Sequence, residues 1–284
     1  MSISPTNNGN TNFPTTPFVT QTEATTIERP IRNDDNSSCC RPAYRSDWHA
    51  AETLEAAKTG SLSDVNQVIN LQGNINATDS RGYTPLMWAS IFGHGDVAIR
   101  LLECCADPDI ANDINTTALM FAAKIGNRTI VQKMLEKLAD VNATNTFGST
   151  ALAFAVQGGS EDIVSLLLHN GADPNIVDID GNSVLMYAVK GGNAEIVQDL
   201  LGAGAKSNAT NIRNETALLM AVKINNLEIV KILVPERTSF YLLNVPDNSG
   251  LTPLLLAVSS SFTEIENYLN RFSSTLPRIT TGFP

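Results

Sequence analysis

The stretch Thr84-Pro85-Leu86-Met87-Trp88-Ala89 returns as Thr117-Ala118-Leu119-Met120-Phe121-Ala122 and again as Thr150-Ala151-Leu152-Ala153-Phe154-Ala155. The Thr or Ser that opens each copy recurs every 33 residues, and the last step is 36 residues; these positions are Thr84, Thr117, Thr150, Ser183, Thr216 and Thr252. A fixed period of this length is typical of a stacked array of structural repeats. The internal repeat therefore decides the fold class.

Each copy carries signals for the start and the end of a first helix. The Thr or Ser can accept a hydrogen bond from the free N–H groups of that helix, and Pro85 and Pro253 stand in its first turn, where a missing N–H is harmless. Gly or Asn, which best tolerate positive φ, occupy the turn tip before the helix and the position where it ends. The tips are Gly82, Asn115, Gly148, Gly181, Asn214 and Gly250, and the ends are Gly93, Gly126, Gly159, Gly192 and Asn225.

A second helix follows in each copy, with apolar residues at positions i, i+1, i+4 and i+5. One example is Ile163, Val164, Leu167 and Leu168. Neither helix buries its apolar face alone, so adjacent helix pairs must stack to close a continuous core.

The unit resembles the ankyrin repeat, whose pattern is a turn Gly, Thr-Pro-Leu, an Ala pair, Gly-His, an aliphatic pair, Leu-Leu, then Gly-Ala-Asp and Asn. Two copies match most clearly, from Gly82 to Asp109 and from Gly148 to Asn175. The first contains Gly82, Thr84-Pro85-Leu86, Ala89, Gly93-His94, Val97, Leu101-Leu102 and Ala106-Asp107. The second contains Gly148, Thr150-Ala151-Leu152, Ala155, Gly159, Ile163-Val164, Leu167-Leu168 and Gly171-Ala172-Asp173-Pro174-Asn175. The resemblance implies an all-α ankyrin-repeat solenoid of stacked helix-turn-helix pairs with β-hairpin-like finger loops.

We expect three segments along the chain. Residues 1–46 are rich in Asn, Thr and Pro and poor in aliphatic side chains, which predicts a disordered arm. Residues 47–272 form the repeat domain, with units at 47–78, 79–111, 112–144, 145–177, 178–210, 211–246 and 247–272. Three extra residues between Leu233 and Asn244 lengthen one connection and are expected to shift the last repeat. Residues 273–284 form a short tail.

The charge of the chain bounds its partners. The charged residues of the arm cancel, so the formal net charge of −10 resides on the chain that follows the arm, which is almost entirely the repeats. Nucleic-acid binding needs a basic face, and we therefore expect protein partners and no nucleic acid. No apolar run is long enough for a membrane span, and we expect a monomer.

The four cysteines form two adjacent pairs, Cys39-Cys40 and Cys104-Cys105. Two isolated pairs do not make a disulfide framework, so we expect free thiols in a reducing, cytoplasmic compartment. The alternatives are lipidation of Cys39 and Cys40, or a metal site using Cys104, Cys105 and His94. A zinc site wants four ligands at set spacing and the chain has three histidines, so we expect no metal.

No group of residues predicts catalysis or a cofactor. The histidines lie in different repeats, and the resemblance gives His94 a structural role at the Gly-His position. The paired acids Glu161 and Asp162 open a second helix, where they complement its dipole. Two columns are expected to pack in the core, namely Met87, Met120 and Met186, and then Trp88, Phe121, Phe154, Tyr187, Met220 and Leu256. We therefore expect no enzyme.

The resemblance places outward-facing residues beside each turn Gly and at the end of each first helix. From these we predict twelve partner-binding residues: Arg81, Tyr83, Ile91, Phe92, Ile114, Ile125, Phe147, Gln157, Asp180, Lys190, Arg213 and Lys223. Six of them would form an apolar patch in the N-terminal half, namely Tyr83, Ile91, Phe92, Ile114, Ile125 and Phe147. Lys190, Arg213 and Lys223 would add a basic feature suited to a carboxylate or a phosphopeptide. The opposing interpretation is that these side chains pack against one another.

These features predict a non-enzymatic protein-interaction module that binds through the concave groove and finger tips. One alternative is an inhibitor that masks the active or basic surface of a target. Another is a secreted bacterial effector that acts on host proteins and is delivered to a host cytoplasm. The sequence does not name the partner, because specificity resides in a few surface residues.

Overall fold

The computed structural model describes residues 49–235 and 240–273. The predicted arm, including Cys39 and Cys40, and the predicted tail from residue 274 lie outside the described residues. All the described residues belong to the larger of two compact units of the chain, residues 37–284.

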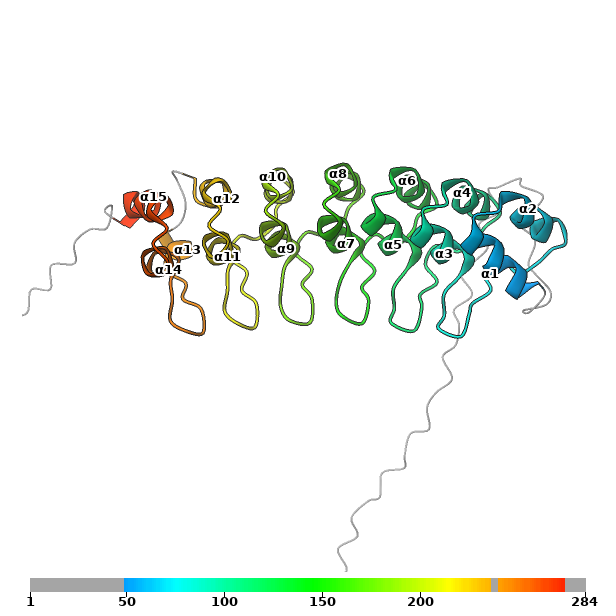
Figure 1. The fold of residues 1–284 in the computed structure, drawn as a ribbon, viewed down its shortest axis with the longest axis horizontal. Coiled ribbons are helices and arrows are strands. Elements are labelled where there is room, and N and C mark those ends of the chain that lie inside the picture. The colour runs from blue at the N-terminus through cyan, green and yellow to red at the C-terminus, as the bar shows by residue number, and fades with distance from the viewer. Residues whose placement is uncertain (1–48, 236–239, 274–284) are drawn as a thin grey trace, which may run out of the picture. The chain divides into compact units, whose positions relative to one another are not determined.

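The described residues form seven consecutive helix pairs and one additional short helix. The first, inner helices are α1 (Ala50–Thr59), α3 (Pro85–Phe92), α5 (Ala118–Ile125), α7 (Ala151–Gly158), α9 (Val184–Gly191), α11 (Ala217–Lys223) and α14 (Pro253–Ser259). The second, outer helices are α2 (Leu62–Asn70), α4 (Gly95–Glu103), α6 (Arg128–Glu136), α8 (Glu161–His169), α10 (Ala194–Gly202), α12 (Leu227–Leu233) and α15 (Thr263–Ser273). Figure 1 shows the inner helices in one row, the outer helices in a second row, and loops projecting from the inner row. The predicted all-α solenoid is confirmed.

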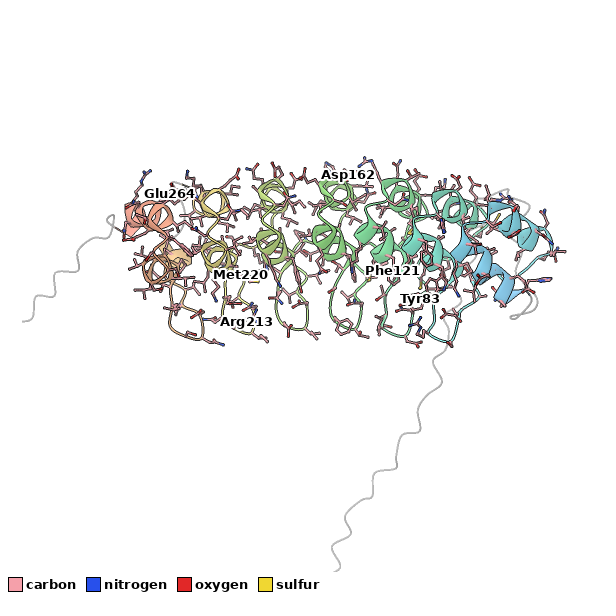
Figure 2. All side chains as sticks on the ribbon, in the orientation of Figure 1. Tyr83, Phe121, Asp162, Arg213, Met220 and Glu264 are labelled. Atoms are coloured by element: carbon pink, nitrogen blue, oxygen red, sulfur yellow. The ribbon has the colours of Figure 1, made fainter. Side chains whose placement is uncertain are left out.

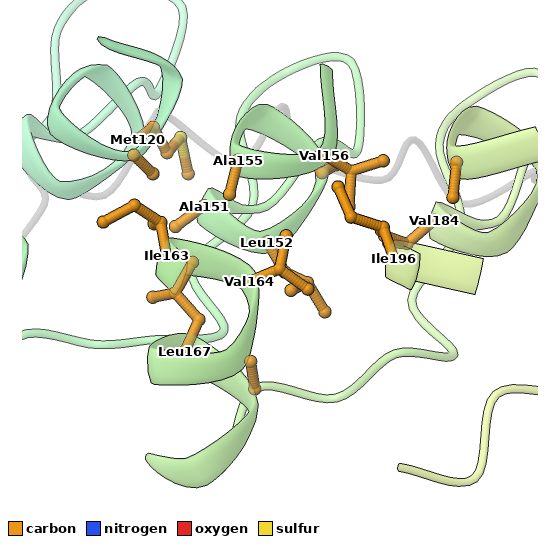
Figure 3. Packing of buried hydrophobic residues seen from close by; sticks show 14 of the residues in the cluster. Met120, Ala151, Leu152, Ala155, Val156, Ile163, Val164, Leu167, Val184 and Ile196 are labelled. Carbon is orange, nitrogen blue, oxygen red and sulfur yellow. The ribbon is translucent and has the colours of Figure 1, made fainter. Parts of the chain in front are cut away.

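The core runs continuously from one pair to the next. Ile163, Val164 and Leu167 of α8 are fully buried, and Figure 3 shows them beside Leu152 of α7. Burial of each side chain of this size contributes about 1.5–3 kcal/mol. The predicted methionine column also lies in this core, because Met87, Met120 and Met186 are all buried.

The Thr or Ser predicted to cap each inner helix makes its capping hydrogen bond in α3, α7, α9, α11 and α14. Thr84 Oγ1, for example, accepts a hydrogen bond from Met87 N at 3.2 Å. The prediction is wrong at Thr117, whose side chain makes no capping bond to α5. The backbone of Thr117 forms a bridge with Ala111, and its Oγ1 is buried with no hydrogen-bond partner in the structure.

The loops that precede the inner helices are termed the finger loops, and they cover residues 79–83, 112–116, 145–149, 178–182, 211–215 and 247–251. Each predicted tip has positive φ, as at Gly82 (79°) and Asn115 (56°). A Cβ on Gly82 would lie 2.9 Å from Asn112 Cα, so glycine also permits the close approach of the next finger. Isolated antiparallel bridges close two of the hairpin-like loops, Ala111 with Thr117 and Val177 with Ser183.

The insertion after α12 leaves the register of the fingers unchanged. The short helix α13 (Phe240–Leu243) follows the insertion, and Leu242 and Leu243 are buried. From the second finger on, the residue that follows the first Asp or Asn of the finger donates its N–H to the preceding finger. Asn248 N does so across the insertion, donating to Arg213 O at 3.1 Å. The last finger therefore pairs with its neighbour as the others do.

Candidate partner-binding surface

Each finger loop is shaped by the side chain of its first residue. Asn145 Oδ1 accepts hydrogen bonds from Phe147 N at 3.0 Å and Ser149 N at 2.9 Å. The same pair of bonds recurs in every finger, with the acceptors Asp79, Asn112, Asn145, Asp178, Asn211 and Asp247. These bonds replace missing backbone partners, so the loops present their side chains in a fixed conformation.

Adjacent fingers are tied together by backbone hydrogen bonds. Thr146 N donates to Ile114 O at 3.0 Å, and Ile179 N donates to Phe147 O at the same distance. Ile212 N continues the series to Asp180 O at 2.9 Å. The exposed side chains of successive fingers therefore lie on neighbouring loops that are bonded to one another.

Exposed apolar side chains accumulate on the fingers and at the ends of the inner helices. Of the six residues in the predicted patch, Phe92, Ile114, Ile125 and Phe147 are exposed, whereas Tyr83 and Ile91 are half-buried. The apolar row does not stop in the N-terminal half, because Ile179 is 67% and Ile212 is 66% exposed. The sequence contains a signal for both. In these two fingers the apolar residue is the first one after the Asp or Asn that begins the finger, whereas Ile114 and Phe147 are the second.

The N-terminal part of this surface is an aromatic cluster. Tyr83 stacks on Trp88 with ring centroids 4.9 Å apart, and Trp88 stacks on Phe92 at 5.8 Å. Lys58 Nζ lies 4.9 Å from the Trp88 ring, and the Arg81 guanidinium lies 5.5 Å from the Tyr83 ring. Stacked rings and cation–π contacts each contribute about 0.5–1.5 kcal/mol beyond area burial.

Two fingers are attached to their inner helix through an acid and an aromatic donor. Asp79 Oδ2 accepts the indole N–H of Trp88 at 3.2 Å, and Asp178 Oδ2 accepts the Tyr187 hydroxyl. Burial raises the pKa of Asp79, but hydrogen bonds from the backbone of Arg81 and Tyr83 outweigh it and the pKa lies below its usual value. Burial and the neighbouring Asp178 raise the pKa of Tyr187 to about 12. Asp178 is thus ionised and Tyr187 neutral at pH 7.

The C-terminal part of the surface is an ionic cluster. Glu215, with a side chain 8% exposed, accepts from Arg213 Nε at 2.9 Å and from Lys223 Nζ at 2.6 Å. Lys223 Nζ also lies 3.3 Å from Asp247 Oδ2 of the next finger. Burial raises the pKa of Glu215, but hydrogen bonds from Asn211 and from these cations lower it to about 2. The cluster joins two successive repeats.

The family model for ankyrin repeats matches residues 53–145, 86–178, 119–211 and 185–271. The chain belongs to the ankyrin repeat family. Among solved structures, the ankyrin repeat array is similar to "the ankyrin repeat domain of Bcl-3: a unique member of the IkappaB protein family". That crystal structure shares 29% sequence identity, covers 76% of this chain and 97% of its own, and has a TM-score of 0.66. No curated protein sequence matches the chain.

Charge is divided between the two rows of helices in this ankyrin array. The inner helices from α3 to α14 contain no Asp or Glu, and three of them, α5, α9 and α11, carry a lysine in the last turn. Every outer helix carries at least one acid. Figure 2 places Asp162 and Glu264 on the outer row, away from Tyr83 and Arg213 on the finger side. The finger side is thus the less acidic side.

The predicted basic feature is largely neutralised within the array. Arg213 and Lys223 are paired with Glu215 and Asp247, whereas no ion pair to Lys190 occurs among the described residues. Glu215 stands beside the turn tip Asn214 but is buried, and its carboxylate accepts from both cations. Thr116, which stands beside the turn tip Asn115, is 2% exposed and does not face outward. The remaining predicted residues Gln157, Asp180 and Lys190 are exposed on the finger side but make none of the contacts of the two clusters.

The aromatic column packs against the core as predicted, although its members are half-buried: Trp88, Phe121, Phe154, Tyr187, Met220 and Leu256. The structural role of His94 is confirmed by its contact with a neighbouring repeat, because its Nε2 lies 3.0 Å from Lys58 O. Within residues 49–235 and 240–273, no three His, Cys, Asp or Glu side chains gather as a metal site. None of the helices in these ranges has the length and apolar character needed to cross a membrane.

One of the two described cysteines departs from the sequence expectation. Cys105 is part of a disulfide, whereas Cys104 is a buried thiol outside any disulfide. The expectation of free thiols is therefore wrong for Cys105. A disulfide requires two Cβ atoms about 3.5–4.5 Å apart in space, which spacing along the chain does not reveal.

Proposed function

We propose that the chain is a non-enzymatic protein-interaction module whose finger side binds the partner. The exposed apolar row on the fingers carries this proposal. Ile114, Phe147, Ile179 and Ile212 stand on loops whose backbones are fixed by side-chain bonds and tied to one another. A preorganised apolar surface loses little conformational entropy on binding, and surfaces of this kind are used for protein contacts.

The partner is proposed to present aliphatic or aromatic anchors together with acidic groups. The finger side offers Arg81, Lys124 and Lys190 as exposed cations beside the apolar row. No acid lies on the inner helices from α3 to α14 to compete for them. Arg213 and Lys223 should attract acidic groups of the partner more weakly, because they are already paired with Glu215 and Asp247.

The experiment compares two variants of the full chain in a pull-down, followed by calorimetry with each protein identified. The finger variant carries Ile114→Ser, Phe147→Ser, Ile179→Ser and Ile212→Ser. The control carries Leu62→Ser and Leu138→Ser, which change exposed apolar residues at the start of the outer helix α2 and in the loop after the outer helix α6. We expect the finger variant to lose at least 100-fold in affinity and the control to bind as the unchanged chain does. If the finger variant bound the partner as tightly as the unchanged chain, the finger side would be excluded as the binding surface.

The acidic outer helices favour a second candidate function, the masking of a basic surface on a target protein. Glu161, Asp162 and Glu195 stand in the first turns of α8 and α10 on that side. Electrostatic complementarity of this kind accelerates association and depends on salt. The variant Glu161→Gln/Asp162→Gln/Glu195→Gln tests it: binding through this side would slow and lose its salt dependence, whereas binding through the fingers would not change.

A further inference from the structure

One column of the array places a lysine in the last turn of three inner helices. The column consists of Ile91, Lys124, Gln157, Lys190, Lys223 and Ser259, spaced by 33 residues and finally by 36. Lys124, Lys190 and Lys223 are termed the column lysines, and they belong to α5, α9 and α11. Figure 1 shows these helices in one row above the finger loops, so the three lysines start from equivalent places.

Lys223 shows how a column lysine holds a carboxylate. Its Nζ donates to Glu215 Oε1 at 2.6 Å, at the last position of its own finger, and to Asp247 Oδ2 at 3.3 Å, at the first position of the next finger. The Glu215 carboxylate also accepts from Arg213 Nε at 2.9 Å and from Asn211 Nδ2 at 2.8 Å. A carboxylate placed between two successive fingers is therefore within reach of a column lysine.

The other two column lysines have no acid in these two places. The residues there are Thr116 and Asn145 for Lys124, and Asn182 and Asn211 for Lys190. Both lysines are exposed, and neither forms an ion pair within residues 49–235 and 240–273. Their charges are thus available to a partner.

The surroundings of these two lysines leave the places beside them uncharged. Lys124 Nζ lies 5.8 Å from the centroid of the Phe154 ring, so this lysine extends toward the following repeat. The exposed acids of the same fingers, Asp113 and Asp180, stand at the second and third positions of the loop and not at the position of Glu215. The difference between the column lysines therefore lies in the finger residues and not in the lysines themselves.

We propose that Lys124 and Lys190 are receptors for two carboxylates of the protein partner, and that Glu215 fills the third receptor from within the chain. The inference rests on the proposed function, because it requires the partner to lie along the fingers. Each carboxylate of the partner would lie beside its lysine as Glu215 lies beside Lys223. The repeat between the two receptors offers the exposed ring of Phe147 for an apolar anchor.

The distance between the two receptors sets the spacing of the acids in the partner. Lys124 and Lys190 are two repeats apart, and packed helices lie about 8–10 Å from each other, so the receptors are about 16–20 Å apart. An extended segment covers that distance in about five or six residues. A helix covers it in about eleven to thirteen residues. The partner segment thus carries two acids at one of these spacings with an apolar residue between them.

The first test selects phage-displayed random peptides of about 16 residues, long enough for either spacing, on three forms of the full chain. The forms are the unchanged chain, Lys124→Gln/Lys190→Gln, and the finger variant described above. We expect the unchanged chain to select paired acids around an apolar residue. The lysine variant should keep the apolar residue and lose the paired acids, and the finger variant should select neither. In calorimetry with a selected peptide, each lysine substitution should weaken binding by about two- to fivefold.

The outcomes separate the receptors from the proposed function. Peptides with the apolar residue but without paired acids would overturn the receptors and leave the finger side as the binding surface. The same peptides recovered from all three forms would overturn both. An unchanged chain that selects no peptides would overturn the receptors.

The second test opens the third receptor with the neutral variant Glu215→Gln/Asp247→Asn, whose side chains keep the shape of the acids. Lys190 and Lys223 are one repeat apart, so we expect this variant to select additional peptides with acids about three residues apart if extended, or about six if helical. The control Glu161→Gln/Asp162→Gln changes the net charge equally on the outer helix α8 and should select as the unchanged chain does. Shorter spacings that appear in the control, or in neither variant, would overturn the role of Glu215 as the internal occupant.

Discussion

Around Trp88 the finger side is held together by stacked rings, whereas around Glu215 it is held by ion pairs. The two regions are equivalent repeats of one fold: Tyr83 and Glu215 occupy the same position, four residues after Asp79 and Asn211. In both, the first residue of the finger bonds to the N–H groups two and four residues later. Because these bonds set the backbone, the side chains on it can differ without a change of fold.

The two regions also connect repeats differently. Tyr83 contacts Phe121 of the next repeat with ring centroids 5.8 Å apart, and this contact is non-polar. Lys223 reaches Asp247 of the next finger through a charge. The first kind of contact is insensitive to pH and salt, whereas the second depends on the ionisation of partly buried carboxylates. Substitutions can therefore distinguish the regions.

The largest effect is expected for Trp88→Ala. Trp88 packs against the core, stacks with Tyr83 and Phe92, and donates to Asp79, so its loss should lower the free energy of unfolding by about 3–4 kcal/mol. Urea denaturation measures the change. Phe92→Ala is the control, because Phe92 is 53% exposed at the edge of the stack and should cost less than about 1 kcal/mol. If both variants lost the same free energy of unfolding, the stacking of the aromatic rings, and not the packing of Trp88 against the core, would stabilise this region.

Glu215→Ala should have the next largest effect and lower the free energy of unfolding by about 2–3 kcal/mol. It removes the acceptor shared by Arg213, Lys223 and Asn211, although Lys223 keeps Asp247 as a partner. Denaturation in urea again gives the value.

Lys190 provides the matched comparison for Lys223, since it stands at the equivalent position one repeat earlier and is exposed. Lys223→Ala should cost about 1–2 kcal/mol, and Lys190→Ala should be within about 0.5 kcal/mol of the unchanged chain. A similar cost for both lysines would contradict a stabilising ionic cluster.

Lowering the pH should weaken the ionic region selectively. The pKa of Glu215 is about 2 in the folded chain and about 4.3 when unfolded, so the unfolded state takes up the proton first as pH falls. The stabilisation by Glu215 is complete above about pH 5 and is lost towards pH 2, amounting to about 2–3 kcal/mol. Unfolding measured from pH 7 to pH 3 should show a shallower loss in Glu215→Gln. An identical slope would mean that other carboxylates control acid stability.

The local features of the fold could be predicted from the sequence because short-range backbone requirements select particular residues. Gly82 and Asn115 have the positive φ expected at turn tips, and Thr84 makes the expected cap. The ionic cluster was not predicted. In the sequence, Lys190, Arg213 and Lys223 group as a basic feature, and this grouping does not include the acids that lie beside two of these cations in the folded chain. Glu215 and Asp247 approach these cations only when a finger, a helix end and the next finger come together.

The extent of the apolar row and the state of Cys105 were missed for related reasons. Ile179 and Ile212 stand one residue earlier in their fingers than Ile114 and Phe147, and the predicted apolar patch did not include them although both are exposed. The disulfide of Cys105 depends on a distance in space that no repeat pattern contains.

The smallest effects concern the acid or amide that begins a finger and the side chain nine positions after it, in the fingers that start at Asp79, Asn112 and Asp178. Asp79 and Asp178 face the donors Trp88 and Tyr187, whereas Asn112 faces Phe121, which has none. Tyr187→Phe removes a donor from Asp178 but leaves Asn182 bonded to it, so the expected loss is about 1 kcal/mol.

Phe121→Tyr is the reciprocal change. Asn112 Nδ2 is buried and has no hydrogen-bond partner in the structure, and a tyrosine hydroxyl placed as in Tyr187 could accept from it. Satisfying a buried donor should raise the free energy of unfolding by about 0.5–1 kcal/mol, measured by urea denaturation. Phe154→Tyr in the next repeat is the control, because Asn145 Nδ2 is not among the buried atoms that lack a partner. If both tyrosines stabilised equally, the gain would come from the ring position and the matching of donor to acceptor would have no part in it.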